Sequence, residues 1–155
     1  MWLLTELLCS GNMLTSLYTL PSGLINLDCL NNMLKSMPTL PDRLVLLDCA
    51  DNQLSFLPAL PNSLTDLHCE NNLLTSLCML PLGLTWLSCQ NNKLRALNVT
   101  GLTEMLFLNC SDNFTAVPDG IIGGGFVLHP WHIFPWHILG IINYDFSFDL
   151  CYNDN

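Results

Sequence analysis

The sequence has few charged residues, and basic residues are the scarcest of them. Only 11% of its 155 residues are charged, against roughly 25% in typical soluble domains. Intrinsic disorder is excluded because it requires low hydrophobicity and high charge, whereas 50% of this chain is hydrophobic. Four Lys and Arg residues against 13 Asp and Glu give a net charge of −9. This balance argues against nucleic acid as a partner, and a polar partner is expected to be basic.

Features of secretion are also missing at the start of the chain. Residues 1–10 (MWLLTELLCS) contain no basic residue and include Glu6, whereas a signal peptide begins with a positively charged region. We therefore expect an intracellular protein with reduced thiols.

Motifs of catalysis are missing as well. The glycines at 123–125 are not followed by the lysine that a phosphate-binding loop requires. His68 precedes Cys69, but adjacent residues of a strand face opposite sides and do not form a nucleophile–base pair. The sequence predicts that the protein is not an enzyme, and no cofactor is expected.

Cysteine, in contrast, is frequent, and six of the eight cysteines follow a nearly fixed interval. Five of them lie 20 residues apart, and a sixth follows after 21; these are Cys9, Cys29, Cys49, Cys69, Cys89 and Cys110. Disulfide frameworks in small secreted proteins do not use one fixed interval. One cysteine per unit of a structural repeat explains the spacing.

Aligned on these cysteines, the chain repeats the pattern L-x-x-L-x-C-x-x-N-x-L-x-x-L-P-x-L-P-x-x. Two of its units read LINLDCLNNMLKSMPTLPDR and LVLLDCADNQLSFLPALPNS. Leucine supplies 35 residues of the chain, of which 32 precede position 120. A 20-residue period with this spacing is the signature of a leucine-rich repeat solenoid.

Each column of the repeat has a physical role. Leu27 and Cys29 lie two residues apart, so they face the same side of a short strand. Cysteine acts there as a small buried hydrophobe, and the asparagine three residues later can bond peptide groups left free at the turn. Proline in the second half of each unit prevents a helix. The predicted fold class is an α/β-type solenoid with one curved parallel sheet of about six short strands and an extended, largely helix-free convex side.

The repeat unit also resembles that of a known group of proteins. The segments TLPSGL, TLPDRL, ALPNSL and MLPLGL resemble the 20-residue leucine-rich repeats of secreted bacterial effectors of the Yersinia and Shigella type. The segments LDCLNNML and LDCADNQL are similar to repeats in bacterial and giant-virus proteins. Over residues 4–118, the resemblance implies a protein-interaction scaffold that acts in the cytosol of a host cell.

Partner binding is expected on the solvent-facing side of the sheet, which is the concave side of such solenoids and is called the sheet face below. Its eighteen outward positions form three columns: Glu6, Asn26, Leu46, Asp66, Trp86 and Phe107; Leu8, Asp28, Asp48, His68, Ser88 and Asn109; Ser10, Leu30, Ala50, Glu70, Gln90 and Ser111. Five of these residues are acidic and none is Lys or Arg.

Acidic residues around an aromatic anchor favour a protein partner with a basic segment. The predicted partner-binding residues are Asp28, Asp48, Asp66, His68, Glu70, Trp86 and Phe107. The alternative is that the acidic residues only keep a leucine-rich protein soluble.

The end of the chain has a different composition. We assign residues 1–120 to the solenoid and residues 121–155 to an apolar, aromatic tail that is interpreted as a cap on the last repeat. Residues 121–143 contain no charged residue, and their length would suit a bilayer span. The alternatives are therefore a membrane-associated accessory protein anchored by this tail, and translation of a degenerate reading frame. The absence of flanking basic residues argues against the anchor.

Zinc-ligand chemistry also occurs in the tail. His129, His132, His137 and Cys151 are residue types that bind zinc. They lack the closely spaced cysteine pair of common structural zinc sites, so no metal site is predicted.

Overall fold

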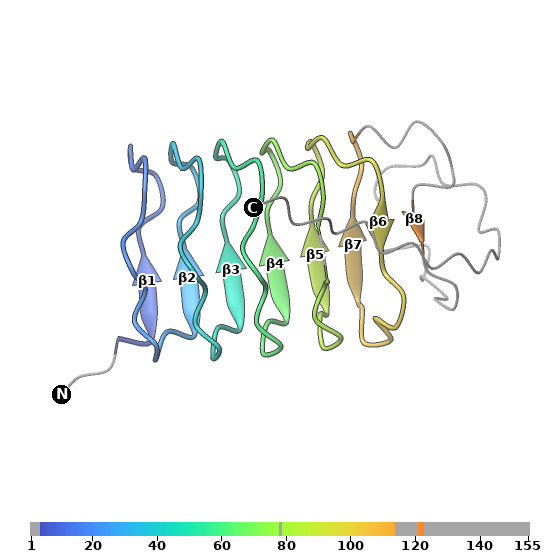
Figure 1. The fold of residues 1–155 in the computed structure, drawn as a ribbon, viewed down its shortest axis with the longest axis horizontal. Helices are drawn as coiled ribbons and strands as arrows, with labels where there is room; N and C mark the ends of the chain where they lie inside the picture. The colour runs from blue at the N-terminus through green and yellow to red at the C-terminus, as the bar shows by residue number, and fades with distance from the viewer. Residues whose placement is uncertain (1–3, 78, 114–120, 123–155) are drawn as a thin grey trace, which may run out of the picture.

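The computed structural model describes residues 4–77, 79–113 and 121–122, and within them six strands form one parallel sheet (Figure 1). The sheet order is β1-β2-β3-β4-β5-β7. Its strands are β1 (Glu6–Leu8), β2 (Asn26–Asp28), β3 (Leu46–Asp48), β4 (Asp66–His68), β5 (Trp86–Ser88) and β7 (Phe107–Asn109). Each repeat forms one coil of the solenoid and adds one strand beside the last. The predicted leucine-rich repeat solenoid with a six-stranded parallel sheet is confirmed.

The register of the sheet follows the 20-residue period residue by residue. Leu27 pairs with Leu47, and Leu47 pairs with Leu67. The last pair differs, because Trp86 lies opposite Phe107, 21 positions later. The leucine of each strand therefore faces the core in every coil. The residues on either side of it lie on the sheet face, and Ser88 is the only buried one among them.

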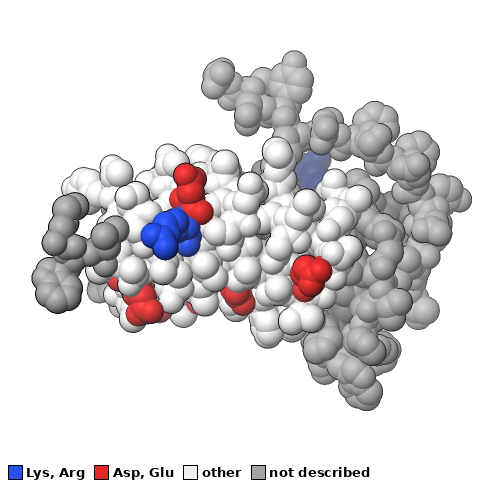
Figure 2. Space-filling model, turned by 90° about the horizontal axis from the view of Figure 1, so that it is seen from below, with Lys and Arg blue, Asp and Glu red and all other residues white. Residues whose placement is uncertain are grey.

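The return halves of the coils contain no helix in the described ranges. A turn closes the return half in four coils, where the backbone N–H of Leu24, Leu44, Leu64 and Leu84 donates to the carbonyl of the proline three residues earlier at 3.0–3.1 Å. A second, two-stranded sheet joins β6 (Leu97–Asn98) to β8 (Ile121–Ile122) in parallel. Seen from below, the described surface shows a few separate charged groups among mostly uncharged residues (Figure 2).

Leucines and cysteines fill the space between the sheet and the return halves. Leu27, Leu47, Leu67 and Leu87 are fully buried, as are Cys29, Cys49, Cys69 and Cys89. The thiols of Cys29 and Cys49 donate to the backbone carbonyls of Asp48 and His68 in the next coil, at 3.3 and 3.4 Å. The four inner cysteines therefore form a row of free, buried thiols, as the repeat pattern predicts, while Cys9 and Cys110 at the ends of the column are half-buried.

The asparagine column joins each coil to the coil before it. The amide nitrogen of Asn52 donates to the carbonyls of Cys29, Cys49 and Ala50 at 3.0–3.2 Å. Its amide oxygen accepts the backbone N–H of Leu34 at 2.9 Å. Asn32, Asn72, Asn92 and Asn113 make the corresponding bonds. The predicted role of these asparagines is confirmed.

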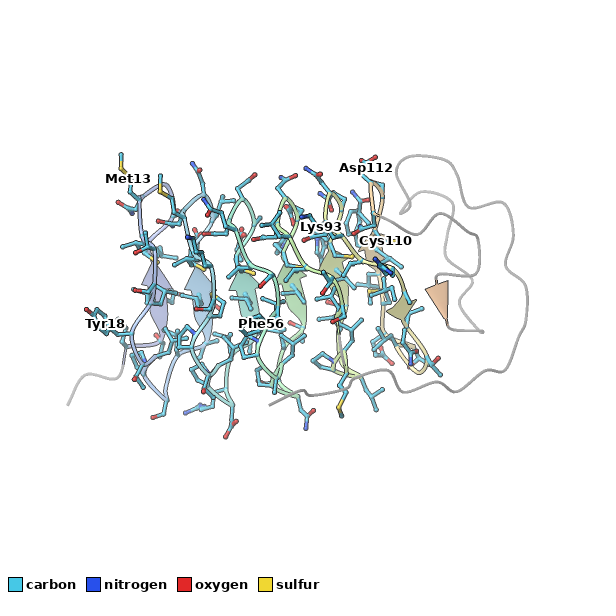
Figure 3. All side chains as sticks on the ribbon, turned by 45° about the horizontal axis from the view of Figure 1, so that its top comes forward. Met13, Tyr18, Phe56, Lys93, Cys110 and Asp112 are labelled. Carbon is cyan, nitrogen blue, oxygen red and sulfur yellow. The ribbon has the colours of Figure 1, made fainter. Side chains whose placement is uncertain are left out.

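The residue before each asparagine of this column, including Asn12 of the first coil, has a positive φ. The six residues are Gly11, Asn31, Asp51, Asn71, Asn91 and Asp112, with φ between 51° and 64°. Left-handed backbone is costly for most residues, whereas Gly, Asn and Asp tolerate it. The turn that follows each strand therefore restricts this position to these three residue types. These turns lie along one edge of the solenoid, where Met13 and Asp112 mark its two ends in Figure 3.

Candidate partner-binding face

The predicted partner-binding residues lie on five adjacent strands of one sheet and on the turn after β4. Asp28 pairs with Asp48, and Asp48 pairs with His68. Asp66 pairs with Trp86, which in turn pairs with Phe107. Neighbouring strands of a sheet are about 4.8 Å apart. The acidic residues therefore occupy β2 to β4 and the turn after β4, and the large aromatic residues occupy β5 and β7.

Two of the acidic residues also hold the backbone at the end of their strands. Oδ1 of Asp28 accepts the N–H of Leu30 at 3.1 Å, and Oδ1 of Asp48 accepts the N–H of Ala50 at 3.2 Å. Asn109 accepts the N–H of Ser111 in the same way. An asparagine can therefore replace either aspartate without loss of this bond, although the charge would be removed.

Burial changes the ionisation of two acidic residues near the centre of the sheet face. Burial raises the pKa of Asp48, and Asp28 and Asp51 raise it further, while the N–H of Ala50 and the His68 ring act in the opposite direction. Burial also raises the pKa of Glu70, against the effects of its own backbone N–H and of His68.

The side chain of Glu70 also contains an oxygen atom that lacks a donor. Its Oε2 atom and the Oε1 atom of Gln90 are buried without a hydrogen-bond partner in the described structure. A carboxylate oxygen without a donor disfavours the charged form. As the pH falls, Asp48 and Glu70 therefore lose their negative charge at a higher pH than fully solvated carboxylates do.

The aromatic residues form a row across β4, β5 and β7. The rings of Trp86 and Phe107 stack with centroids 4.0 Å apart and an angle of 14° between their planes. The His68 ring lies 5.9 Å from Trp86 on the other side, tilted by 30°. The indole N–H of Trp86 donates to Oγ of Ser88 at 3.2 Å, and the residue remains 37% exposed. The sequence predicts Trp86 and Phe107 as neighbours but does not predict their stacking.

The described residues do not support a reactive centre at His68. The imidazole lies on the sheet face, whereas Cys69 is fully buried. Burial raises the pKa of the Cys69 thiol well above its ordinary value, so the nucleophilic thiolate is disfavoured. Among the described residues, no cluster of His, Cys, Asp and Glu could hold a metal ion.

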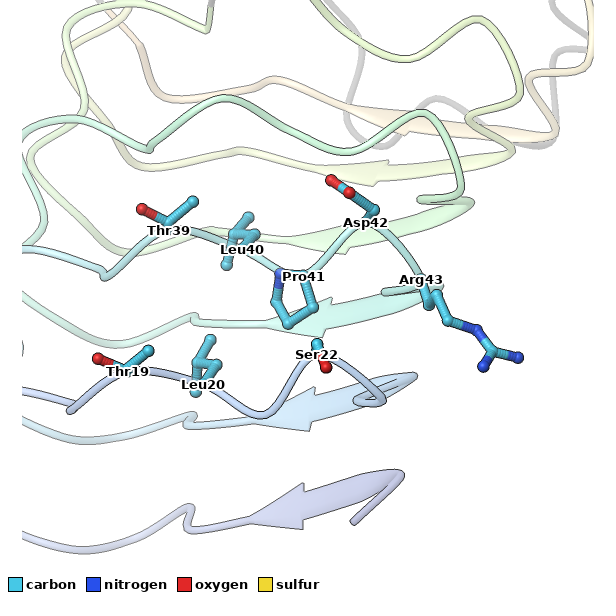
Figure 4. A pocket seen from close by; sticks show the side chains of 8 residues that line it. All are labelled: Thr19, Leu20, Ser22, Thr39, Leu40, Pro41, Asp42 and Arg43. Atoms are coloured by element: carbon cyan, nitrogen blue, oxygen red, sulfur yellow. The ribbon is translucent and has the colours of Figure 1, made fainter. Parts of the chain in front are cut away.

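A shallow hollow lies elsewhere, between the return halves of the first two coils (Figure 4). Leu20, Leu40 and Pro41 contribute to its lining, and Arg43 points away from it. Its lining also includes Thr19, Ser22, Thr39 and Asp42.

Three predictions concern residues outside the described ranges, and the first is that residues 121–155 form a cap, since only Ile121 and Ile122 of that segment are described. The membrane-anchor alternative depends on residues 121–143, of which only Ile121 and Ile122 are described, and the four zinc-ligand types of the tail all lie beyond them. In the part of the chain that the structure describes, no helix has the length and apolar character needed to cross a bilayer.

Comparison with known proteins identifies similar solved structures. No protein-family model matches the chain, and no curated protein matches it. YopM from Yersinia enterocolitica WA-314 is 38% identical with a TM-score of 0.63, over 65% of this chain and 22% of YopM. The leucine-rich repeat domain of a Shigella effector is 29% identical with a TM-score of 0.61, over 77% of this chain and 70% of that domain. The functional domain of InlJ from Listeria monocytogenes is 26% identical with a TM-score of 0.47, over 71% of this chain and 35% of that one.

The first two similarities extend over most of the solenoid. They confirm the resemblance to leucine-rich repeats of bacterial effectors that the repeat unit indicates. This chain spans less than a quarter of the length of YopM.

Proposed function

We propose that this leucine-rich repeat solenoid is a noncatalytic scaffold that binds a basic segment of a protein partner on its sheet face. The observation that carries the proposal is the separation of charge. Five acidic residues and no Lys or Arg occupy the eighteen predicted outward positions of the sheet face, of which the structure buries Ala50 and Ser88. The basic residues of the chain, Lys35, Arg43, Lys93 and Arg95, are all exposed and lie outside the strands.

The partner is expected to be a protein inside a cell. The similarity to YopM and to a Shigella effector domain supports this setting, and the cytosol of a host cell is the corresponding location. Reduced thiols at Cys29, Cys49, Cys69 and Cys89 are consistent with it.

The arrangement of the sheet face indicates how the segment lies. Acidic residues on β2 to β4 would attract its basic side chains, while Trp86 and Phe107 on β5 and β7 would bury apolar surface. Charge accelerates association and is weakened by salt, whereas apolar burial mainly slows dissociation. A segment that crosses the strands would be bound by both the charge attraction and the apolar burial.

A triple variant that neutralises three carboxylates of the sheet face tests the proposal without damage to the turns. In Asp28→Asn/Asp48→Asn/Asp66→Asn, the side-chain oxygens that accept hydrogen bonds remain. We expect this variant to bind a fluorescent Lys- and Arg-containing peptide about tenfold more weakly than the parent, with a smaller salt dependence. Fluorescence anisotropy at several ionic strengths measures both effects.

The matched control removes the same number of charges elsewhere. Asp42→Asn/Glu104→Gln/Asp112→Asn changes three exposed acidic residues outside the eighteen positions. Equal weakening in the two triple variants would mean that only net charge matters. Unchanged affinity in the sheet-face variant would show that the acidic residues serve solubility alone.

A further inference from the structure

We infer that the sheet face contains a subsite for one arginine side chain of the partner, formed by Trp86 and Asp66 where β4 meets β5. The inference rests on the proposed function, because it specifies which basic residue the acidic face selects. It is carried by the geometry of an aromatic ring and a carboxylate on adjacent strands.

The Trp86 ring is held in place before any partner binds. Phe107 covers one of its faces at 4.0 Å with nearly parallel planes. The indole N–H is fixed by its bond to Ser88. A side chain that is already ordered loses little conformational freedom on binding. The indole is therefore a rigid surface against which a planar group can pack.

The uncovered face of the ring is directed toward β4. Since Phe107 on β7 stacks on one side, the other side faces the strand that carries Asp66 and His68. The His68 ring is 5.9 Å away and tilted, which is farther than the stacked Phe107 ring. Trp86 keeps 37% of its surface exposed. Part of the residue is therefore accessible to a partner, and the acidic residues lie on the neighbouring strand.

Asp66 supplies a carboxylate next to that ring. It is the register partner of Trp86, which places their backbones about 4.8 Å apart. The Thr65 hydroxyl donates to Oδ2 of Asp66 and orients the carboxylate. Asp48 and Glu70 add negative charge on the same side of the ring. A cation that contacts the indole is thus within reach of a fixed carboxylate.

A guanidinium group fits this combination better than an ammonium group. It is planar, so one face can stack on the indole while its N–H groups donate to the carboxylate. The ammonium group of lysine is a compact and strongly hydrated charge that cannot stack. The subsite therefore discriminates between the two basic residues, which the acidic charge alone would not do.

Two peptides that differ only in the basic residue test the subsite. We use the full chain with fluorescently labelled GRGRGR and GKGKGK and measure affinity by anisotropy. The arginine peptide should bind about fivefold more tightly. In Trp86→Leu the ratio should fall to about one through loss of affinity for the arginine peptide, and Trp86→Phe should restore part of it. Phe56→Leu, at an aromatic residue that is 56% exposed outside the sheet, should leave the ratio unchanged.

The outcomes separate this inference from the proposed function. Equal affinity for the two peptides, or a ratio that persists in Trp86→Leu, overturns the arginine subsite while the acidic face remains a binding surface. Failure of both peptides to bind, or binding that does not weaken in the sheet-face triple variant, overturns both. An NMR measurement with each peptide at saturating concentration gives a second readout, in which the arginine peptide should shift the indole N–H signal of Trp86 more than the lysine peptide does.

Discussion

The asparagine of each repeat is the residue on which the joining of coils depends most directly. Asn52 bonds the carbonyls of two successive coils and accepts an N–H from the preceding one. Among the described residues, Asn12 of the first coil donates only to the carbonyls of Cys9 and Ser10 in its own coil. The asparagine of an inner coil is therefore expected to contribute more to the free energy of unfolding than the asparagine of the first coil.

Leucine at position 52 should destabilise the fold more than leucine at position 53. Asn52→Leu leaves buried backbone groups without partners, at a cost of about 1–3 kcal/mol in the free energy of unfolding. Gln53 is exposed, so Gln53→Leu should change the stability little, and Asn12→Leu should lie between the two. Urea denaturation followed by circular dichroism compares the three variants. Equal midpoints for Asn52→Leu and Gln53→Leu would refute the proposed role of the asparagine column.

At the scale of the elements, the strand register is preserved although the fifth coil is longer. Trp86 and Phe107 are 21 residues apart but pair directly. The additional length is accommodated outside the strands, where Gly101 has a φ of 80°. A Cβ atom at Gly101 would lie 3.2 Å from the side chain of Leu82. Glycine at this position therefore permits both the turn and the close approach of the neighbouring return half.

Alanine at position 101 should lower stability, whereas alanine at position 83 should not. Gly101→Ala combines an unfavourable left-handed φ with a tight contact, and we expect it to cost about 1–2 kcal/mol in the free energy of unfolding. A Cβ atom at Gly83 meets nothing within 4 Å, and its φ lies outside the left-handed region. Thermal unfolding of the two variants measures the difference. A Gly101→Ala variant as stable as Gly83→Ala would show that the turn tolerates a side chain.

The features that repeat were predictable from the sequence, and those that do not repeat were not. The period determines the strand order, the buried leucine and cysteine columns and the asparagine bonds. The restriction to Gly, Asn or Asp before each asparagine was also visible, at Gly11 and Asp51 for example, but the repeat pattern above treats that position as variable. The stacking of Trp86 on Phe107 depends on side-chain orientations that occur once. Periodicity contains no information about such contacts.

At the scale of the whole molecule, the buried thiols make stability depend on pH. Burial raises the pKa of Cys29 from 9.0 to about 12. The pKa of Cys49, Cys69 and Cys89 is likewise raised well above that value. An unfolded chain would ionise these thiols at a lower pH than the folded chain. Their contribution to stability is therefore complete below pH 9 and is lost as the pH rises toward 12.

The free energy of unfolding should accordingly fall as the pH rises from about 9 toward 12. Cys49→Ala should be less stable than the parent at pH 7, because it leaves a small cavity. Its stability should nevertheless decline less steeply with pH, because one titrating group has been removed. Denaturation curves at several pH values give the two slopes. Parallel slopes would mean that Cys49 does not contribute to the alkaline sensitivity.

The residue-by-residue register of the coils also has a consequence for how such a protein can evolve. Because β2, β3 and β4 pair through equivalent positions, an in-frame duplication of the gene segment for the third coil would insert another strand with the same neighbours on both sides. The core would gain one more layer of the same contacts. The sheet face would lengthen by about 4.8 Å. Recombination between repeats would thus change the length of the solenoid in steps of one strand.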